Sequence, residues 1–566
     1  MFCVFETLNL NFKYKMSYPK IPLAQSIIEI CKAKGLLDII ISPGSRNAPL
    51  TIGFVGNKEF NCYSIADERC AAFMAVGMAQ QLKRPVAVVC TSGSALLNYY
   101  PAVAEAFYSQ LPIVIISADR PTSKIDIGDG QTIRQRNVYA NHILYSANLT
   151  EEASEANDLE INEAINQAIV KKGPVHINAP FEEPLYETDE VATVTTQVLP
   201  PVPLPEQLPD LKPYTEQWNK AKKKLILVGV NDPDSIDQAI IDRLAADASV
   251  VVMKEATSNL HHPHFIGNID TIITPFTEDD FKAFQPEILI TIGGMVVSKR
   301  VKAFLRKYKP EAHWHIDTLR AYDTFGSLTR HFECTPNTFF NEFLPGTAAV
   351  ASDYLENAVA LKALREVKHQ EYSARIPYSD FKVFETILSA LPQNSQLQIS
   401  NSSAIRYAQL FAIDPSIEVF CNRGTSGIDG STTTAIGAAV ASKKENILIT
   451  GDISFFYDSN ALWNAYIPKN FKIILINNQG GGIFRILPGH QETEVFNTFF
   501  ETTHNFTAEQ LASMYHFKYY QATDLEALET VLPEVLQENS QPVLFEIHTP
   551  TTVNDSVLLE YFKNLT

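Results

Sequence analysis

The sequence predicts an α/β protein of three modules, each a parallel sheet covered by helices. Short apolar strands of roughly four to seven residues alternate with helical patterns of roughly ten to fifteen residues, which is typical of such sheets. The chain has 566 residues, too many for a single hydrophobic core, and about three domains are expected at this length.

The first module is expected at residues 16–195. Helical spacing of apolar residues predicts helices at 68–82 and 95–109. Runs rich in β-branched residues predict the strands Asp38–Ser42, Tyr63–Ala66, Pro85–Cys90, Pro112–Ser117 and Pro174–Asn178.

A proline-rich stretch at 196–215 predicts a stiff linker to a central module at 216–348. The central module is expected to contain the strands Lys224–Gly229, Ser249–Met253, Glu287–Ile292 and Trp314–Asp317. A charged, helix-prone connector at 349–375 leads to the third module at 376–566. Its expected strands are Leu397–Ser400, Glu418–Cys421, Ile447–Thr450, Lys472–Ile476 and Pro542–His548.

Bulk composition narrows the class of protein. The net charge of −18 argues against a nucleic-acid partner, and no apolar run is long enough to predict a membrane span. The seven cysteines are scattered and include no Cys-x-x-Cys pair, which favours a reducing cytoplasm. Residues 1–15 make a poor signal peptide, and translation starting at Met16 is a plausible alternative.

Oxygen donors follow two strands of the third module. Asp452 follows one strand, and Asn478 and the Gly480 carbonyl follow the next. Ligands bind at the carboxyl ends of parallel strands, and a carboxylate with neutral oxygens suits Mg²⁺. Two ordinary strand-end turns are the alternative, because Asp and Asn are common there.

Three further segments follow strands and open helices. Thr91-Ser92-Gly93-Ser94 could bind an anion through its amides and hydroxyls or could form a capping box. The glycine-rich stretch 421–430, which includes Arg423, could approach a phosphate closely. Asp67 suits a helix N-cap with Glu68 in the first turn, or Glu68 could place a carboxylate against an aminopyrimidine ring.

Several strand ends also bear cations, which is unexpected in so acidic a chain. Ser402 follows one strand, with Arg406 one helical turn beyond it, and Arg423 lies in the glycine-rich stretch. Three other strand-end segments carry arginine: Ser45-Arg46, Arg120, and Gln131 with Arg134. Arginine grips carboxylates bidentately, so together they suggest a site for carboxylate substrates, whereas each arginine alone could form a surface salt bridge. Lys299 and Arg300 alone would suggest a solvated basic patch.

Taken together these segments resemble one family over nearly the whole chain. The motifs are Ser-Pro-Gly-Ser-Arg (42–46), Asp-Glu-Arg (67–69), Ala-Asp-Arg-Pro (118–121), Gln-x-Ile-Arg-Gln (131–135), Asn-Arg-Gly-x-Ser-Gly-Ile-Asp-Gly (422–430) and Gly-Asp-Ile-Ser (451–454). They resemble the MenD family of menaquinone biosynthesis, within the thiamine diphosphate (ThDP) enzymes of the pyruvate oxidase and decarboxylase superfamily. Ile453 replaces the third glycine of the wider superfamily and fits this branch, and Gly130 stands where related sequences can have Asn.

The resemblance implies three doubly wound domains: pyrimidine-binding, central and diphosphate-binding. It also implies a homodimer or dimer of dimers, with ThDP between the pyrimidine domain of one subunit and the diphosphate domain of another. The implied reaction is decarboxylation of 2-oxoglutarate and 1,4-addition of the succinyl carbanion equivalent to isochorismate. A plain 2-oxo acid decarboxylase, an acetolactate-type synthase and a non-catalytic paralogue are the alternatives.

The resemblance also implies roles for individual residues. Glu68 would activate the cofactor, and Asp452, Asn478 and Gly480 would hold Mg²⁺ or Mn²⁺ against the diphosphate. The cofactor would also contact Thr91, Ser92, Gly93, Ile428, Gly451 and Ser454. The substrate site would comprise Ser45, Arg46, Arg120, Gln131, Lys299, Arg300, Ser402, Arg406 and Arg423, with Ile483 and Phe484 as its apolar wall.

Overall fold

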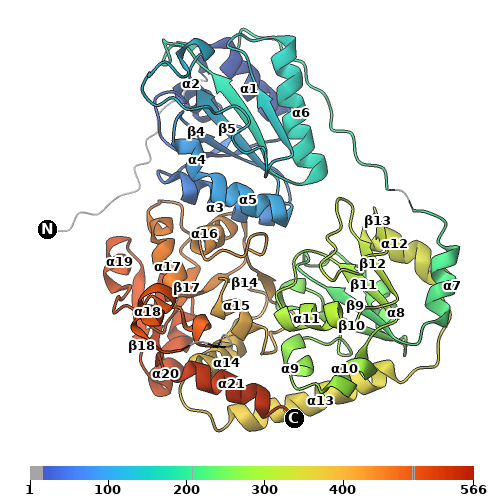
Figure 1. Ribbon diagram of the computed structural model, residues 1–566. Helices are drawn as coiled ribbons and strands as arrows, with labels where there is room; N and C mark the ends of the chain where they lie inside the picture. Colours follow the sequence, from blue (N-terminus) through green and yellow to red (C-terminus); the bar gives the residue numbers. More distant parts are fainter. Residues whose placement is uncertain (1–16, 207, 487–488, 490) are drawn as a thin grey trace. The chain divides into compact units, whose positions relative to one another are not determined.

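The computed structural model describes residues 17–206, 208–486, 489 and 491–566 (Figure 1). The described residues fall into two compact units, one within residues 1–202 and the other within residues 203–566. The expected extra segment 1–15 and the alternative start at Met16 lie outside the described residues.

The first unit contains a six-stranded sheet with the order β3-β2-β4-β5-β7-β6, in which all neighbours are parallel. Its strands are β2 (Asp38–Ile41), β3 (Asn61–Ser64), β4 (Val86–Cys90), β5 (Ile113–Asp119), β6 (Tyr145–Asn148) and β7 (Val175–Pro180). Because β2 and β4 are neighbours while β3 lies beyond β2, the strand order reverses between β2 and β4. Ligands bind open α/β sheets at such a point.

Apolar helix faces cover this sheet and form its core. The helices are α1 (Pro22–Ala33), α2 (Ala48–Gly56), α3 (Glu68–Leu82), α4 (Ala95–Asn98), α5 (Tyr100–Ser109) and α6 (Glu155–Lys171). α1, α2 and α6 pack against one set of buried strand residues, and α3 packs against both β4 and α5 (Figure 1). A two-stranded sheet joins β1 (Tyr18–Pro19) to β8 (Thr188–Asp189).

Two sequence expectations for this unit need correction, and one strand was missed. The strand expected at Tyr63–Ala66 lies at Asn61–Ser64, where the chain pairs with β2. The helix expected at 95–109 is divided into α4 and α5, and Pro101 stands in the first turn of α5, where its missing N–H costs nothing. Strand β6 had not been expected.

The second unit begins with a five-stranded parallel sheet of order β10-β9-β11-β12-β13. Its strands are β9 (Lys224–Val228), β10 (Val250–Lys254), β11 (Ile288–Ile292), β12 (Ala312–Ile316) and the unexpected β13 (Arg330–Phe332). Its helices are α7 (Lys212–Lys220), α8 (Gln238–Ala245), α9 (Ile269–Ile273), α10 (Glu278–Phe284), α11 (Lys299–Lys307) and α12 (Pro336–Phe343). The connector expected at 349–375 contains the long helix α13 (Tyr354–Ser373).

A six-stranded parallel sheet of order β15-β14-β16-β17-β19-β18 completes the second unit. Its strands are β14 (Gln396–Ile399), β15 (Glu418–Phe420), β16 (Asn446–Gly451), β17 (Phe471–Asn477), the unexpected β18 (Lys518–Ala522) and β19 (Val543–His548). Its helices include α14 (Asp380–Ala390), α15 (Ser403–Ala408), α16 (Ser431–Ala441), α17 (Asp452–Tyr457), α18 (Glu494–Phe496), α20 (Leu525–Val535) and α21 (Asn554–Lys563). The order reverses between β14 and β16.

The predicted fold class is therefore confirmed, because three parallel sheets flanked by helices follow one another along the chain. The exact domain boundaries stay predictions. The cysteines within the described residues are free thiols, and Cys3 lies outside them. No helix in the described part of the chain is long and apolar enough to cross a membrane.

Candidate active site

In the first unit, the predicted substrate residues Ser45 and Arg46 and the predicted cofactor residue Thr91 lie where the strand order reverses. The Arg46 backbone N–H, after β2, donates to Thr91 Oγ1, after β4, at 3.3 Å. The Arg46 guanidinium is buried and donates to the Phe181 carbonyl at 3.0 Å and to Glu183 at 3.2 Å. Ser45 beside it is exposed. The structure brings Arg46 and Thr91 together but directs the Arg46 charge toward Glu183, so its substrate role stays a prediction.

The loop that contains Gln131 packs against the turn after β4. Gln135 accepts the Gly93 N–H at 2.9 Å and donates to Asn178 at 2.8 Å. Gly93 has φ +89°, and a Cβ there would lie 3.4 Å from the Gln131 backbone, so glycine suits both the conformation and the close approach. The Arg120 guanidinium donates to the Gly130 carbonyl at 3.0 Å. Thus Gly93, Gln131 and Arg120 form one neighbourhood.

Glu68 is the first residue of α3, at the end of the neighbouring strand β3. The Asp67 side chain caps the helix by accepting the Cys70 N–H at 3.1 Å, which confirms the capping role considered for Asp67. The Glu68 carboxylate is partly exposed and accepts Asn98 Nδ2 at 3.4 Å. Ser94, by contrast, makes no side-chain cap for α4, so the capping box considered there is not formed.

In the second unit, the predicted metal ligands meet at the ends of β16 and β17, which are parallel neighbours. Asp452 is buried, and its carboxylate accepts the Gly480 N–H at 2.9 Å and the Ile453 N–H at 2.7 Å. Asn478 is also buried, and its Oδ1 receives no hydrogen bond within the described residues. A buried amide oxygen without a donor is costly unless a ligand satisfies it. The donor set therefore fits a hard cation such as Mg²⁺.

This site is not a cluster of acidic and histidine ligands. The described residues contain no group of three or more His, Cys, Asp and Glu that could hold a metal. The predicted set instead combines one carboxylate with the neutral oxygens of Asn478 and Gly480. His504, which sequence reasoning missed, lies with its Nε2 3.3 Å from Asp452 Oδ2.

The segment after Asn478 is anchored by a buried ion pair. Arg485 binds both oxygens of Glu501, with Nη2 2.6 Å from Oε2. The Glu501 carbonyl accepts the Gly481 N–H at 2.6 Å, and a Cβ on Gly480 would come within 2.9 Å of the same carbonyl. The predicted wall residues Ile483 and Phe484 lie in the short turn Gly482–Ile486 between these anchors and are partly buried.

Two cofactor residues predicted from the glycine-rich loop and the strand end are in contact. Ser454 Oγ donates to the Ile428 carbonyl at 2.7 Å, and the Ile428 side chain is partly exposed. A Cβ on Gly451 would have no atom within 4 Å, so there is open space beside the strand end. This arrangement suits a phosphate approaching the backbone.

Asn401 holds the glycine-rich loop in place. Its Nδ2 donates to the Asn422 and Gly427 carbonyls at 2.7 Å each, and its Oδ1 accepts Arg423 Nη1 at 2.6 Å. The next residue, Ser402, has φ 68° and ψ −124° and makes no side-chain cap for α15. Strain of this kind costs about 1–3 kcal/mol and is concentrated at functional sites.

Three predicted cations of the second unit, Arg300, Arg406 and Arg423, act electrostatically on the carboxylates of Asp270, which is half-buried, and Glu255, which is buried. Together with Lys302, we call these residues the cation cluster. Burial raises the pKa of Asp270, while Arg300 and Arg406 lower it. Burial raises the pKa of Glu255 to about 7, while two backbone hydrogen bonds and Arg423 lower it. The cation cluster consists of Arg300, Lys302, Arg406, Arg423, Asp270 and Glu255.

The cluster is crowded with positive charge. Burial and then Arg423 lower the pKa of Arg406, and burial lowers the pKa of Lys302. The Arg300 guanidinium lies 5.1 Å from the centre of the Phe562 ring, and Lys299 is exposed beside it. Four cations against two carboxylates leave an excess of positive charge that suits an anionic ligand.

Sequence reasoning missed the buried and half-buried polar residues that hold these groups. They are Gln135, Glu255, Asp270, Lys302, Asp380, Asn401 and His504. No local motif distinguishes them, although Asn401 directly follows a predicted strand end and is adjacent to Ser402. Their contacts are mostly with residues distant in sequence.

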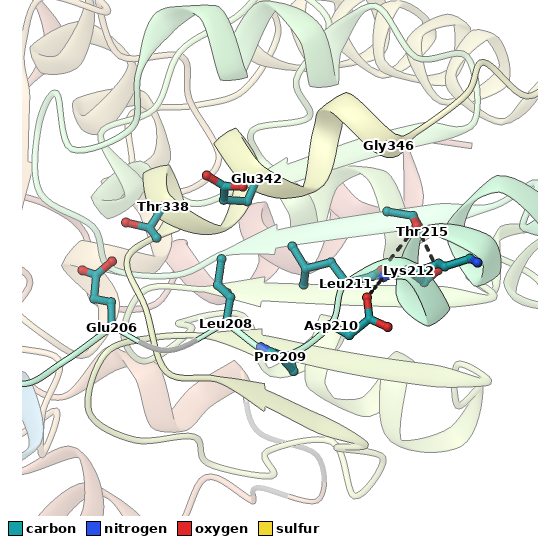
Figure 2. Close-up of a pocket in the computed structure, with 10 residues that line it drawn as sticks. All are labelled: Glu206, Leu208, Pro209, Asp210, Leu211, Lys212, Thr215, Thr338, Glu342 and Gly346. Atoms are coloured by element: carbon teal, nitrogen blue, oxygen red, sulfur yellow. Dashed lines mark hydrogen bonds between the residues drawn. The ribbon is translucent and has the colours of Figure 1, made fainter.

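The second unit also contains a pocket where the linker ends. Its volume is about 540 Å³, and the residues that line it are drawn in Figure 2. It is lined by Glu206, Leu208, Pro209, Asp210, Leu211, Lys212, Thr215, Thr338, Glu342 and Gly346. No predicted site residue lines this pocket. Its three carboxylates oppose one lysine, so its charge does not suit a dicarboxylate.

Three models of thiamine pyrophosphate enzymes match the chain. The N-terminal TPP binding domain matches residues 21–141, and the middle domain matches residues 208–399. The C-terminal TPP binding domain matches residues 402–547. The first match includes Glu68, and the third includes Asp452 and Asn478.

Relatives similar to the chain over nearly all its length are named 2-succinyl-5-enolpyruvyl-6-hydroxy-3-cyclohexene-1-carboxylate synthase. The protein from Flavobacterium psychrophilum is 68% identical, over 97% of this chain and 100% of its own. That from Flavobacterium johnsoniae is 64% identical, over 97% and 100%. That from Christiangramia forsetii is 53% identical, over 97% and 99%.

Proposed function

Because the chain belongs to the 2-succinyl-5-enolpyruvyl-6-hydroxy-3-cyclohexene-1-carboxylate synthase family of thiamine pyrophosphate enzymes, we propose that it catalyses this synthesis. The reaction is decarboxylation of 2-oxoglutarate followed by 1,4-addition of the succinyl carbanion equivalent to isochorismate, within menaquinone biosynthesis.

The cation cluster is the observation that supports these substrates. Arg300, Lys302, Arg406 and Arg423 outnumber Asp270 and Glu255, and both proposed substrates are dicarboxylates. A smaller monocarboxylate would need fewer cations. The guanidinium groups would bind and orient the carboxylates, because Arg presents paired donors that match a carboxylate.

Asp452, Asn478 and the Gly480 carbonyl would hold Mg²⁺ or Mn²⁺. The buried Asn478 Oδ1 supports this, because it receives no hydrogen bond within the described residues. When bound, ThDP supplies the carbanion chemistry that amino-acid side chains lack. Gly451, Ser454 and Ile428 would contact the cofactor in the second unit, and Thr91, Ser92 and Gly93 would do so in the first.

Glu68 would hold and transfer a proton at the aminopyrimidine ring of the cofactor. Its carboxylate stands at the start of α3, beside the switch point of the first sheet, where a ligand is expected. General acid–base catalysis by one placed carboxylate contributes about 10²–10⁴-fold to the rate.

The remaining assignments are part of the same proposal. Ser45, Arg46, Arg120, Gln131, Lys299 and Ser402 would complete the substrate site, with Ile483 and Phe484 as its apolar wall. The protein would act in the cytoplasm as a homodimer or a dimer of dimers. Light scattering of the purified protein tests the oligomer, and a monomer with full activity would contradict it.

The decisive experiment follows isochorismate absorbance in purified protein with ThDP, Mg²⁺ and 2-oxoglutarate. We expect the absorbance to fall only when all components are present. Release of CO₂ at the same rate without isochorismate would instead indicate a simple decarboxylase. If isochorismate is not consumed under any of these conditions, the proposed function is wrong.

A further inference from the structure

Glu255 fixes the start of the helix that presents Lys299 and Arg300. Its carboxylate is only 1% exposed and accepts the Val297 N–H at 2.6 Å and the Ser298 N–H at 2.7 Å. These two amides immediately precede α11, so the negative charge also lies at the favourable end of the helix dipole. Both carboxylate oxygens are thereby used to set where α11 begins.

Asp270 also helps to fix the start of α11. Ser298 Oγ hydrogen-bonds to the Asp270 carboxylate and accepts the Val301 N–H at 3.1 Å as the N-cap of α11. The charges of Arg300 and Arg406 act on Asp270. The start of α11 is therefore tied to two carboxylates, the buried Glu255 and the half-buried Asp270, that face the cations of the cluster.

The chain that follows Glu255 is docked onto the third module. The Ala256 N–H donates to Gln409 Oε1 at 2.9 Å, and Gln409 directly follows α15. Asn259 exchanges two hydrogen bonds with Val419 of β15, at 2.8 and 3.0 Å. Because α15 contains Arg406 and β15 leads to Arg423, residues 255–259 connect α11 to both elements.

We propose that Glu255 is a positioning residue for the dicarboxylate substrates, holding Lys299 and Arg300 in register with Arg406 and Arg423. This inference rests on the proposed function and deepens it. Arg423, Lys302 and Asp270 are the charged groups that face Glu255. Glu255 itself would not touch substrate, because its oxygens are already committed to the two backbone amides.

The test compares Glu255→Gln with wild type in the isochorismate-consumption assay. The amide keeps the size of the side chain, but its nitrogen cannot accept a backbone N–H, so one of the two bonds is lost. We expect kcat/KM for 2-oxoglutarate to fall about tenfold or more, mainly through KM. ThDP affinity, measured by quenching of protein fluorescence, should stay within about twofold of wild type.

The matched control is Asp247→Asn. Asp247 lies just before β10, whereas Glu255 directly follows this strand. Like Glu255, Asp247 uses its carboxylate to accept a backbone N–H, that of Ser249 at 2.9 Å. We expect its KM to equal that of wild type. Equal KM values for wild type and Glu255→Gln would overturn the inference. A wild-type protein that does not consume isochorismate would instead overturn the proposed function.

A second pair of variants decides the matter if Glu255→Gln does not fold. Ser298→Ala removes the N-cap of α11 and its bond to Asp270, whereas Thr277→Ala removes the N-cap of α10 in the same module. A raised KM for 2-oxoglutarate in Ser298→Ala alone supports positioning through the start of α11, and the same KM in both variants contradicts it.

Discussion

Asn478 donates its side-chain amide to the Asp380 carboxylate at 2.9 Å, across 98 residues of sequence. Asp380, the first residue of α14, is itself held by the Thr549 hydroxyl at 2.6 Å and, through its backbone N–H, by Asn554 at 2.7 Å. With Nδ2 committed to Asp380, the buried Oδ1 of Asn478 is the atom that remains for a cation. Such partners orient a metal ligand.

Asp380→Asn is expected to weaken Mg²⁺ binding about 10–100-fold, because the Asn478 amide loses its charged acceptor. Titration of the ThDP-saturated protein with Mg²⁺, followed by fluorescence, measures this without turnover. Asp524→Asn is the control, since Asp524 caps α20 in the same module by accepting the Ala527 N–H. Unchanged Mg²⁺ affinity in Asp380→Asn would show that Asp380 does not orient the ligand.

Glu68→Gln is expected to lower kcat about 10²–10⁴-fold while the fold and ThDP binding are kept. The amide is similar in size but cannot take up a proton. Turnover and ThDP affinity are measured on the same preparation. Asp67→Asn is the matched neighbour, because Asn caps a helix as well as Asp. Near-wild-type turnover in Glu68→Gln would show that Glu68 is not the acid–base group of the reaction.

Arg423→Ala is expected to raise KM for 2-oxoglutarate about tenfold or more, because the alanine removes both its charge in the cluster and its bond to Asn401. Arg406→Ala should act in the same direction. Arg330→Ala, an exposed arginine over the Phe332 ring, should leave KM unchanged. If Arg423→Ala instead lost ThDP binding while its kinetics were otherwise normal, Arg423 would be assigned to the cofactor site and not to the substrate site.

The stability that Glu255 contributes should depend on pH. Burial raises the pKa of Glu255 from its ordinary 4.5 to about 7, so the folded protein binds this proton more tightly than the unfolded chain. Stability therefore falls as pH rises from about 4.5 to 7 and changes little above that range. The thermal midpoint of wild type relative to Glu255→Gln should be lower at about pH 8 than at about pH 5. A midpoint difference independent of pH would show that the Glu255 pKa is not raised.

Local patterns were sufficient wherever a segment was long, apolar and regular. The helix expected at 68–82 is α3, and the buried central strands lie within a few residues of their predicted ranges. Strands β6, β13 and β18 were missed because they lie at sheet edges and have partly exposed side chains in place of an apolar run. Their strand identity comes from pairing with a neighbour.

The sequence alone determined the fold class, the strand-end position of the predicted metal ligands and the resemblance to one family, because these depend on short-range spacing and residue type. Only the tertiary structure decided which polar groups hold them. Asp380 meets Asn478, Glu255 meets Val297 and Ser298, and Gln135 meets Gly93 across stretches of 98, 42 to 43 and 42 residues. Burial makes such contacts necessary, since a polar group removed from water must find its partner wherever the folded chain brings one.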